Sequence, residues 1–350
     1  MRCRWPVQVL LAMAAAAGAG CHAAVEDVPL AEHKISMADK FYDVEALTTE
    51  RAIVVGYGGK ILATENGGRS WTILPSGTDR GLYSVQFVDE DTGWISGQDG
   101  LMLHTTDGGK SWQRQDTGTL VYLFGLSFLD RQRGFAVGDR ATMLETSDGG
   151  QNWAIRKLTQ TGLTAEQEIT AQDPVLYDVQ FIDAQYGWLV GEFGKIYHSR
   201  DGGATFTEQQ ESLLGHGVFD VLDIPTFFAV HFINRREGYV AGLDGKIART
   251  VDGGATWRFE PMQLEFPIVD PLFRAYPVGD GSVWAVGAAG EVVRRLAGAS
   301  EWQRAQLGME VATWLRGVDF VTPDNGWIVG GYGLILHTQD GGQTWLPALG

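Results

Sequence analysis

Three histidines are the residues of this chain that most resemble metal ligands. His104, His198 and His337 occupy the same column of three repeated segments. In the other segments that column holds Ala63, Glu145, Arg249 and Arg294. Ligands on separate repeats would also lie too far apart to share one ion, which sits ~2.1 Å from each ligand nitrogen. We therefore expect a solvated strand position, with no metal site and no cofactor.

Four carboxylates could supply the acid and base of a glycosidase. They fall in equivalent loops and are Asp99, Asp139, Glu192 and Asp244. The chain has 43 acidic residues, so four in loops are expected by chance. Each also fits turn chemistry, as in Asp244-Gly245. We expect a protein without enzymatic activity and keep a carbohydrate-active or carbohydrate-binding protein as the alternative.

An eight-residue box with Asp-Gly-Gly at its centre recurs along the chain. The clearest copies end at Trp112, Trp153, Trp257 and Trp345; a degenerate copy spans 295–302. The carboxylate of such a turn accepts backbone N–H groups, while glycine supplies the positive φ. Two variants have Asn for the Asp or Phe for the Trp. We expect structural roles for the acceptors of the six recognisable boxes: Asn66, Asp107, Asp148, Asp201, Asp252 and Asp340.

The segments around each box determine the architecture. Upstream of the box at Trp112, apolar residues alternate with period two in the runs 82–87, 93–97 and 100–105. Trp71, Trp112 and Trp153 follow one another at intervals of 41 residues, within the period of propeller blades. Seven such units predict an all-β, seven-bladed β-propeller of four-stranded antiparallel blades over 41–350.

The sequence leaves two features of this ring undecided. Insertions at 154–174 and 209–225 widen the spacing between units, and each could be an idle loop or a partner-binding ridge. The last unit ends at Gly350, so no strand remains to overlap the first blade. The ring must close by face packing of its first and last blades, or by pairing of 35–44 with the last blade.

The first 20 residues have the pattern of a secretory signal. Arg2 and Arg4 precede an apolar run at 7–17 that is too short for a permanent membrane span. We therefore expect export to the periplasmic face of a membrane.

The signal ends in Gly18-Ala19-Gly20-Cys21, which resembles the lipobox of bacterial lipoproteins, with Gly18 where that family usually has Leu. We expect lipidation of Cys21, with 21–40 as a tether. Ordinary cleavage after Ala19 or Ala23, which gives a soluble periplasmic protein, is the alternative.

Charge narrows the possible partners. The chain has a net charge of −16, which disfavours nucleic acid and anionic lipid headgroups and weakly favours cationic surfaces. We expect a monomer that does not bind nucleic acid.

Repeated sequence motifs connect the chain to a known family. They include Gly93-Trp94-Ile-Ser-Gly97, Gly187-Trp188-Leu-Val-Gly191 and Gly326-Trp327-Ile-Val-Gly330. The region from about 41 to 345 resembles the photosystem II stability/assembly factor family of Asp-box propellers. This resemblance implies a seven-bladed, non-enzymatic propeller that binds membrane-protein subunits during assembly on the periplasmic or lumenal side. Asp boxes also occur in sialidases, but those resemble six-bladed rings with an Arg-Ile-Pro signature that this chain lacks.

The resemblance also implies where a partner would bind. The family's arginine-rich patch would correspond here to Arg80 and Arg316, before the first strands of two units, although 123–125 and 176–178 carry no arginine. A rival site lies in the loops between second and third strands, which we expect to converge on the central channel. Its candidate anchors are aromatic residues and an arginine: Tyr57, Arg140, Phe193 and Tyr332.

The leading prediction is an exported assembly, stability or scaffold factor for a membrane-protein complex. The alternatives are a sialidase-like or carbohydrate-binding propeller and a purely structural envelope protein.

Overall fold

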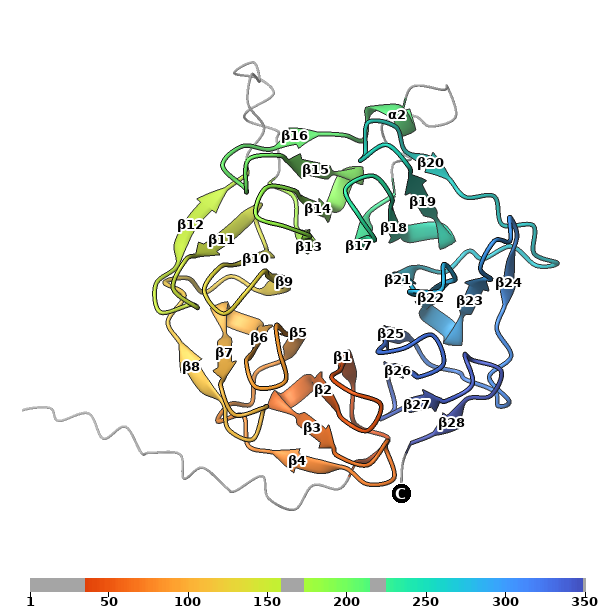
Figure 1. Cartoon of the computed structure of the whole chain (residues 1–350), viewed down its shortest axis with the longest axis horizontal. Helices are drawn as coiled ribbons and strands as arrows, with labels where there is room; N and C mark the ends of the chain where they lie inside the picture. Colours follow the sequence, from red (N-terminus) through yellow and green to blue (C-terminus); the bar gives the residue numbers. More distant parts are fainter. Residues whose placement is uncertain (1–34, 159–172, 215–224, 349–350) are drawn as a thin grey trace, which may run out of the picture. The chain divides into compact units, whose positions relative to one another are not determined.

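A computed structural model describes residues 35–158, 173–214 and 225–348 of the chain. These residues form seven four-stranded antiparallel sheets, arranged as blades around a central opening (Figure 1). The predicted all-β, seven-bladed propeller is confirmed. The signal segment and Cys21 lie outside the described residues, as do 159–172 and 215–224 within the two insertions.

Each blade uses four consecutive strands, ordered from the central opening outward. Blades 1 and 2 contain β1 (Phe41–Ala46), β2 (Ala52–Gly56), β3 (Ile61–Thr64), β4 (Thr72–Leu74), β5 (Leu82–Phe87), β6 (Gly93–Gly97), β7 (Met102–Thr105) and β8 (Gln113–Gln115). Blades 3 and 4 contain β9 (Leu123–Phe128), β10 (Gly134–Gly138), β11 (Thr142–Thr146), β12 (Ala154–Lys157), β13 (Leu176–Phe181), β14 (Gly187–Gly191), β15 (Ile196–Ser199) and β16 (Thr207–Glu208).

Blades 5 to 7 contain β17 (Phe227–Phe232), β18 (Gly238–Gly242), β19 (Ile247–Thr250), β20 (Arg258–Phe259), β21 (Leu272–Pro277), β22 (Val283–Gly287), β23 (Val292–Arg295), β24 (Trp302–Arg304), β25 (Leu315–Phe320), β26 (Gly326–Gly330), β27 (Ile335–Thr338) and β28 (Leu346–Pro347). Short 3-10 turns join second to third strands in five blades: η1 (Tyr57–Gly59), η2 (Gln98–Gly100), η3 (Glu192–Gly194), η5 (Leu243–Gly245) and η6 (Ala288–Gly290). The described part of the second insertion includes a helix, α2 (Glu211–Leu214). Among the residues that the structure describes, no helix is long and apolar enough to cross a membrane.

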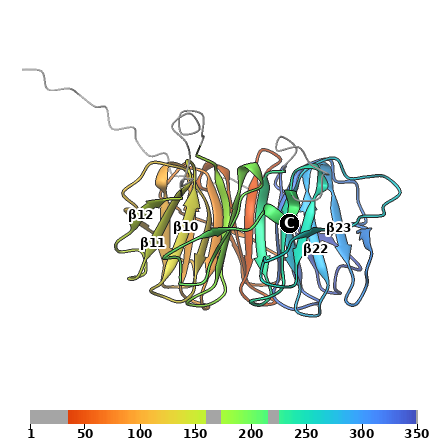
Figure 2. The ribbon, with the colours of Figure 1, turned by 90° about the horizontal axis from the view of Figure 1, so that it is seen from above.

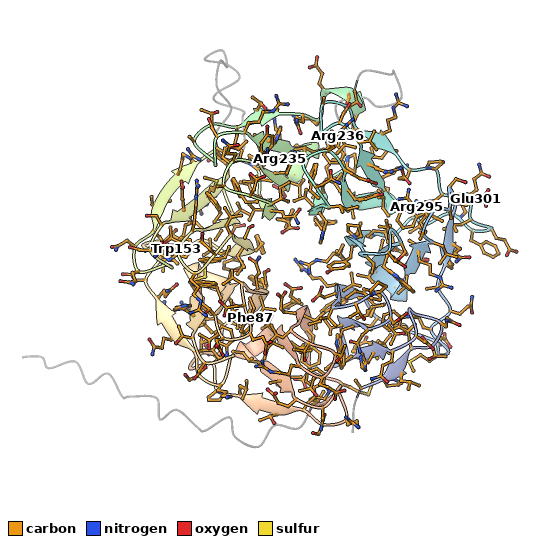
Figure 3. All side chains as sticks on the ribbon, viewed as in Figure 1. Phe87, Trp153, Arg235, Arg236, Arg295 and Glu301 are labelled. Carbon is orange, nitrogen blue, oxygen red and sulfur yellow. The ribbon has the colours of Figure 1, made fainter. Side chains whose placement is uncertain are left out.

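The hydrophobic core lies between the blades. Every residue of each second strand is buried, because that strand is covered on both faces by neighbouring blades. Trp94 of β6 stacks on Phe128 of the next blade at 3.6 Å between ring centroids, and Trp188 stacks on Phe232 at 3.5 Å. Figure 3 shows the side chains that fill the blades.

The Asp boxes form the turns between third and fourth strands. In the box of blade 2, Asp107 Oδ1 accepts a hydrogen bond from Ser111 N at 2.9 Å, and Asp107 Oδ2 accepts one from Ser111 Oγ at 2.6 Å. Gly108 and Gly109 have φ of 74° and 83°, a conformation that glycine adopts without steric cost. The Oδ1 acceptor recurs at Asn66, Asp148, Asp201, Asp252 and Asp340.

The ring closes mainly by face packing. Phe41 and Val44 of the first blade pack with Trp327 and Val329 of the last. The stretch before β1 contributes one isolated bridge, between Lys40 and Gly331. Both candidate modes of closure are therefore present, but packing between the blades provides most of the contact.

The prediction that the histidine column is exposed to solvent is wrong. His198 is only 2% exposed, and its ring stacks on that of Trp188, its cross-strand neighbour, with centroids 4.6 Å apart. His337 stacks on Trp327 in the same way at 3.7 Å. Burial lowers the pKa of His198 to about 4. The column therefore contributes neutral rings to the core, because a tryptophan on the adjacent strand covers each imidazole.

Candidate partner-binding face

The propeller has two unlike faces, seen edge-on in Figure 2. One carries the Asp boxes and the loops between first and second strands. The other carries the loops between second and third strands and the connections from each fourth strand to the next first strand. We call the second one the collar face.

A ring of seven side chains, six of them aromatic, surrounds the channel on the collar face. It consists of the second residue of each first strand, and we call it the aromatic collar: Tyr42, Tyr83, Phe124, Tyr177, Phe228, Phe273 and Arg316. From Tyr42 to Phe273, successive rings have centroids 5.1 to 5.5 Å apart. Each first strand is bulged at this residue, which leaves the residue unpaired and re-aims its side chain.

Arg316 is the only cation of the collar. Its Cζ lies 5.5 Å from the centroid of the Tyr42 ring, and its side chain is partly buried. Burial lowers the pKa of Arg316, and repulsion from Arg274 acts in the same direction. Within the described part of the chain, Arg316 forms no ion pair with a carboxylate. A partly buried guanidinium that forms no direct ion pair favours an anionic partner group.

Arg80 lies on the same face but at a different position from Arg316. Arg80 precedes β5 by two residues, whereas the residue of blade 2 equivalent to Arg316 is Tyr83. Arg80 Nη1 donates to Asp99 O at 3.3 Å, and its Nε lies 3.6 Å from Asp99 Oδ2. The two arginines, from blades 2 and 7, are therefore not equivalent residues of their repeats, because Arg316 belongs to a strand and Arg80 to a connection.

A cavity of about 310 Å³ lies in the channel next to the collar. Its polar lining comes from the third and fifth residues of the first strands and includes Asp43, Glu45, Asp178, Arg274, Tyr276 and Asp319. No residue of the loops between second and third strands lines it. The first strands line this cavity because the first strand of each blade lies inside those loops (Figure 1).

Polar channel residues join one blade to the next. Gln86 Oε1 accepts a hydrogen bond from Phe128 N at 2.6 Å, and Gln86 Nε2 donates to Phe128 O at 3.3 Å. At the closure of the ring, Asp319 Oδ2 accepts a hydrogen bond from Ala46 N at 2.7 Å. These hydrogen bonds assign the channel polar groups a structural role.

Charged channel residues are also engaged within the protein. Asp43 Oδ1 and Arg274 Nη1 form an ion pair at 2.6 Å across blades 1 and 6. Burial raises the pKa of Asp178 to about 6. Burial, reinforced by the nearby charge of Asp319, raises the pKa of Glu45 well above its usual value.

The predicted loop residues lie at exposed turns of the collar face. Phe193 and Tyr332 are 51% and 58% exposed, with φ of 57° and 56°. Arg140, with φ of 56°, occupies the equivalent position in blade 3. Tyr57 is 60% exposed and is the first residue of its turn, one position earlier than the others. These side chains come from blades 1, 3, 4 and 7.

The four loop carboxylates belong to four different blades. Glu192 Oε2 accepts a hydrogen bond from Val175 N at 2.9 Å, and Asp99 is the ion-pair partner of Arg80. Asp99 and Asp244 adopt left-handed turn conformations, with φ of 54° and 55°. In the described ranges, no group of three or more His, Cys, Asp or Glu side chains could hold a metal ion.

Sequence reasoning missed the aromatic collar. The sequence feature that marks the collar is the second residue of each first strand. This residue is aromatic in six of seven blades, and it follows a buried apolar residue in all seven. A column-by-column reading of the repeats would have found it.

These features define a seven-bladed Asp-box β-propeller. The chain belongs to the family described as Photosynthesis system II assembly factor YCF48, whose model matches residues 23–119, 115–172 and 294–348.

Two curated relatives are both named Photosystem II assembly lipoprotein Ycf48. The protein from Synechococcus sp. (strain CC9902) is 27% identical over 126 residues, which are 36% of this chain and 35% of the relative. The protein from Synechocystis sp. (strain ATCC 27184 / PCC 6803 / Kazusa) is 33% identical over 73 residues, 20% of this chain and 21% of the relative. The chain thus matches about a third or less of the length of these relatives.

Solved structures share the fold. YCF48 bound to D1 peptide has a TM-score of 0.66 at 20% identity, over 87% of this chain and 93% of that chain. The GH74 xyloglucanase from Xanthomonas campestris has a TM-score of 0.68 at 13% identity, over 90% of this chain and 55% of that chain. At these identities the likeness concerns the fold alone.

Proposed function

We propose that this chain is an exported, non-enzymatic assembly factor that binds a subunit of a membrane-protein complex through its collar face. The observation that carries the proposal is the aromatic collar with Arg316, a partly buried cation that has no carboxylate partner in the described structure. Aromatic side chains and arginine are the residue types that most often anchor protein interfaces.

Membership of the assembly-factor family supports the same proposal. A relative of the same fold has been solved with a D1 peptide, and the curated relatives are named assembly lipoproteins. For this chain we propose a photosystem-type or other envelope membrane complex as the partner. The partner segment should combine apolar side chains, which pack on the collar, with a carboxylate for Arg316.

We propose that acylation of Cys21 attaches the mature protein to a membrane. The names of the relatives support a lipoprotein, and the acyl chains would contribute ~0.8 kcal/mol per buried CH₂. A Cys21→Ser variant should then move to the soluble periplasmic fraction. An intact mass without lipid, with an N-terminus at Gly20 or Ala24, would contradict this anchor.

Partner capture tests the collar face. The bait is the tagged mature protein, and the prey is a detergent extract of its own membranes. Replacement of Arg80 and Arg316 by Gln should lower capture about tenfold or more, since loss of an interface anchor costs more than 1 kcal/mol. Arg236→Gln is the matched control, because Arg236 is an exposed arginine on the opposite face, labelled in Figure 3.

Three results would count against the proposal. Equal capture by the parent, the double variant and the control would reject the two arginines as partner contacts. Retained capture by the double variant, with loss in a Phe193→Ala and Tyr332→Ala pair, would move the contact to the loop turns. Hydrolysis of xyloglucan or sialosides by the purified protein would reject the non-enzymatic assignment.

A further inference from the structure

The exposed apolar side chains are unevenly distributed between the two faces. Thirteen large apolar residues in the described ranges are exposed, and eight of them lie in loops, connections or the N-terminal stretch of the collar face. Three of these eight are Leu120, Phe193 and Tyr332, at 77%, 51% and 58% exposed. The opposite face has only three: Ile233, Val251 and Leu296.

Two of these side chains are held in a conformation that non-glycine residues rarely adopt. Phe193 and Tyr332 have φ of 57° and 56°. In blades 2 and 5 the equivalent residues are Asp99 and Asp244, and Asp tolerates this conformation better than an aromatic residue does. The turn therefore does not require an aromatic ring, and an exposed ring placed there at a conformational cost indicates a surface contact.

The chain enters the propeller on this same face. Gly333 N donates a hydrogen bond to Asp39 O at 2.8 Å, and Tyr57 N donates one to Lys40 O at 2.9 Å. Cys21 precedes Ile35, where the described structure begins, by 14 residues. That length of chain reaches at most about 50 Å at 3.3–3.6 Å per residue. With Cys21 acylated, a step that rests on the proposed function, the tether brings the collar face within reach of the bilayer.

We propose that the collar face lies against a lipid bilayer, with Leu120, Phe193 and Tyr332 inserted at the membrane surface. Tyr332 fits this boundary because its apolar ring enters the lipid while its hydroxyl stays hydrated, and Phe193 and Leu120 offer wholly apolar side chains to the lipid. The net charge of −16 selects zwitterionic rather than anionic headgroups. A membrane-embedded partner then meets the aromatic collar from the bilayer side.

Vesicle binding of the unanchored protein tests this contact. The mature Cys21→Ser protein is mixed with phosphatidylcholine vesicles, and the bound fraction is measured by flotation. Serine replacements at Leu120, Phe193 and Tyr332 should lower the partition coefficient about tenfold, because they remove the apolar area that would enter the lipid. The matched control carries serine at the three exposed apolar positions of the opposite face, 233, 251 and 296, and should bind like the parent. Addition of phosphatidylglycerol to the vesicles should weaken binding.

The outcomes separate lipid from protein contact. Failure of the parent to bind phosphatidylcholine vesicles, or equal losses in the two triple variants, would overturn the membrane contact. A collar-face variant that binds vesicles like the parent but fails to capture the detergent-solubilised partner would show that these turns contact protein instead. Capture of the partner in detergent, which contains no bilayer, tests the proposed function independently of this inference.

Discussion

Removal of the Asp107 side chain should destabilise one turn by an amount that the structure allows us to estimate. Asp107 accepts hydrogen bonds from Ser111 N at 2.9 Å, Ser111 Oγ at 2.6 Å and Thr105 Oγ1 at 2.8 Å. Each is worth ~0.5–1.5 kcal/mol net, and water replaces part of the loss at this partly exposed turn, so Asp107→Ala should cost about 2 kcal/mol. Asp107→Asn is the control, because Asn66 performs the same role in blade 1 and accepts from Ser70 N at 2.9 Å.

Thermal unfolding followed by circular dichroism measures this cost. For a domain of this size a loss of about 2 kcal/mol lowers Tm by roughly 3 °C, and the asparagine variant should lose less than half of that. The hydroxyl and backbone N–H of Ser111 lower the pKa of Asp107 to about 2, against 3.8 in the unfolded chain. The stabilisation is therefore complete above pH 4, and the difference between parent and alanine variant should shrink as pH falls towards 2. An unchanged Tm for Asp107→Ala, or equal losses in both variants, would refute the structural role of the box.

Three further predictions concern buried groups. Trp327→Ala should cost about 3–5 kcal/mol in urea unfolding, because Trp327 is fully buried where the first and last blades meet; an unchanged midpoint would contradict closure by face packing. Burial raises the pKa of Asp178 to about 6, so the parent should lose stability as pH rises from about 4 to 6. Asp178→Asn should gain stability relative to the parent between about pH 4 and 6. Parallel curves of Tm against pH for the two proteins would show that the carboxyl does not titrate in that range. Burial lowers the pKa of His198 to about 4, so the parent should lose stability as pH falls from about 6.5 to 4. His198→Phe should lack that loss, and an equal acid sensitivity would place the titration elsewhere.

Local patterns predicted the blades and the box turns because the interactions that form them are close in sequence. The acceptor of each box and its backbone donor are four residues apart, as in Asp107 and Ser111. Alternation in 82–87 and 93–97 matches β5 and β6. The prediction that the histidine column is solvated was wrong because burial of His198 depends on stacking against Trp188, which periodicity does not reveal.

The candidate site was only partly predictable. Arg316 and the exposed aromatics of the turns were singled out from residue type, yet their environment was not. Arg80 and Arg316 looked like equivalent arginines beside first strands, but one lies in a connection and the other in a bulged strand. That the first strands line the channel cavity follows from strand order within the blade, which no single repeat displays.

By itself the sequence determined the number of repeats, the four strands in each and the chemistry of the turns, since these depend on contacts within about 40 residues. Only the tertiary structure decided how the ring closes and what surrounds its channel. Tyr42 meets Tyr83 from the next blade and Trp314 from the last one, and Asp319 reaches Ala46 across the closure. These contacts join residues that are 41 to 273 positions apart, and they exist only because seven blades pack into one closed ring.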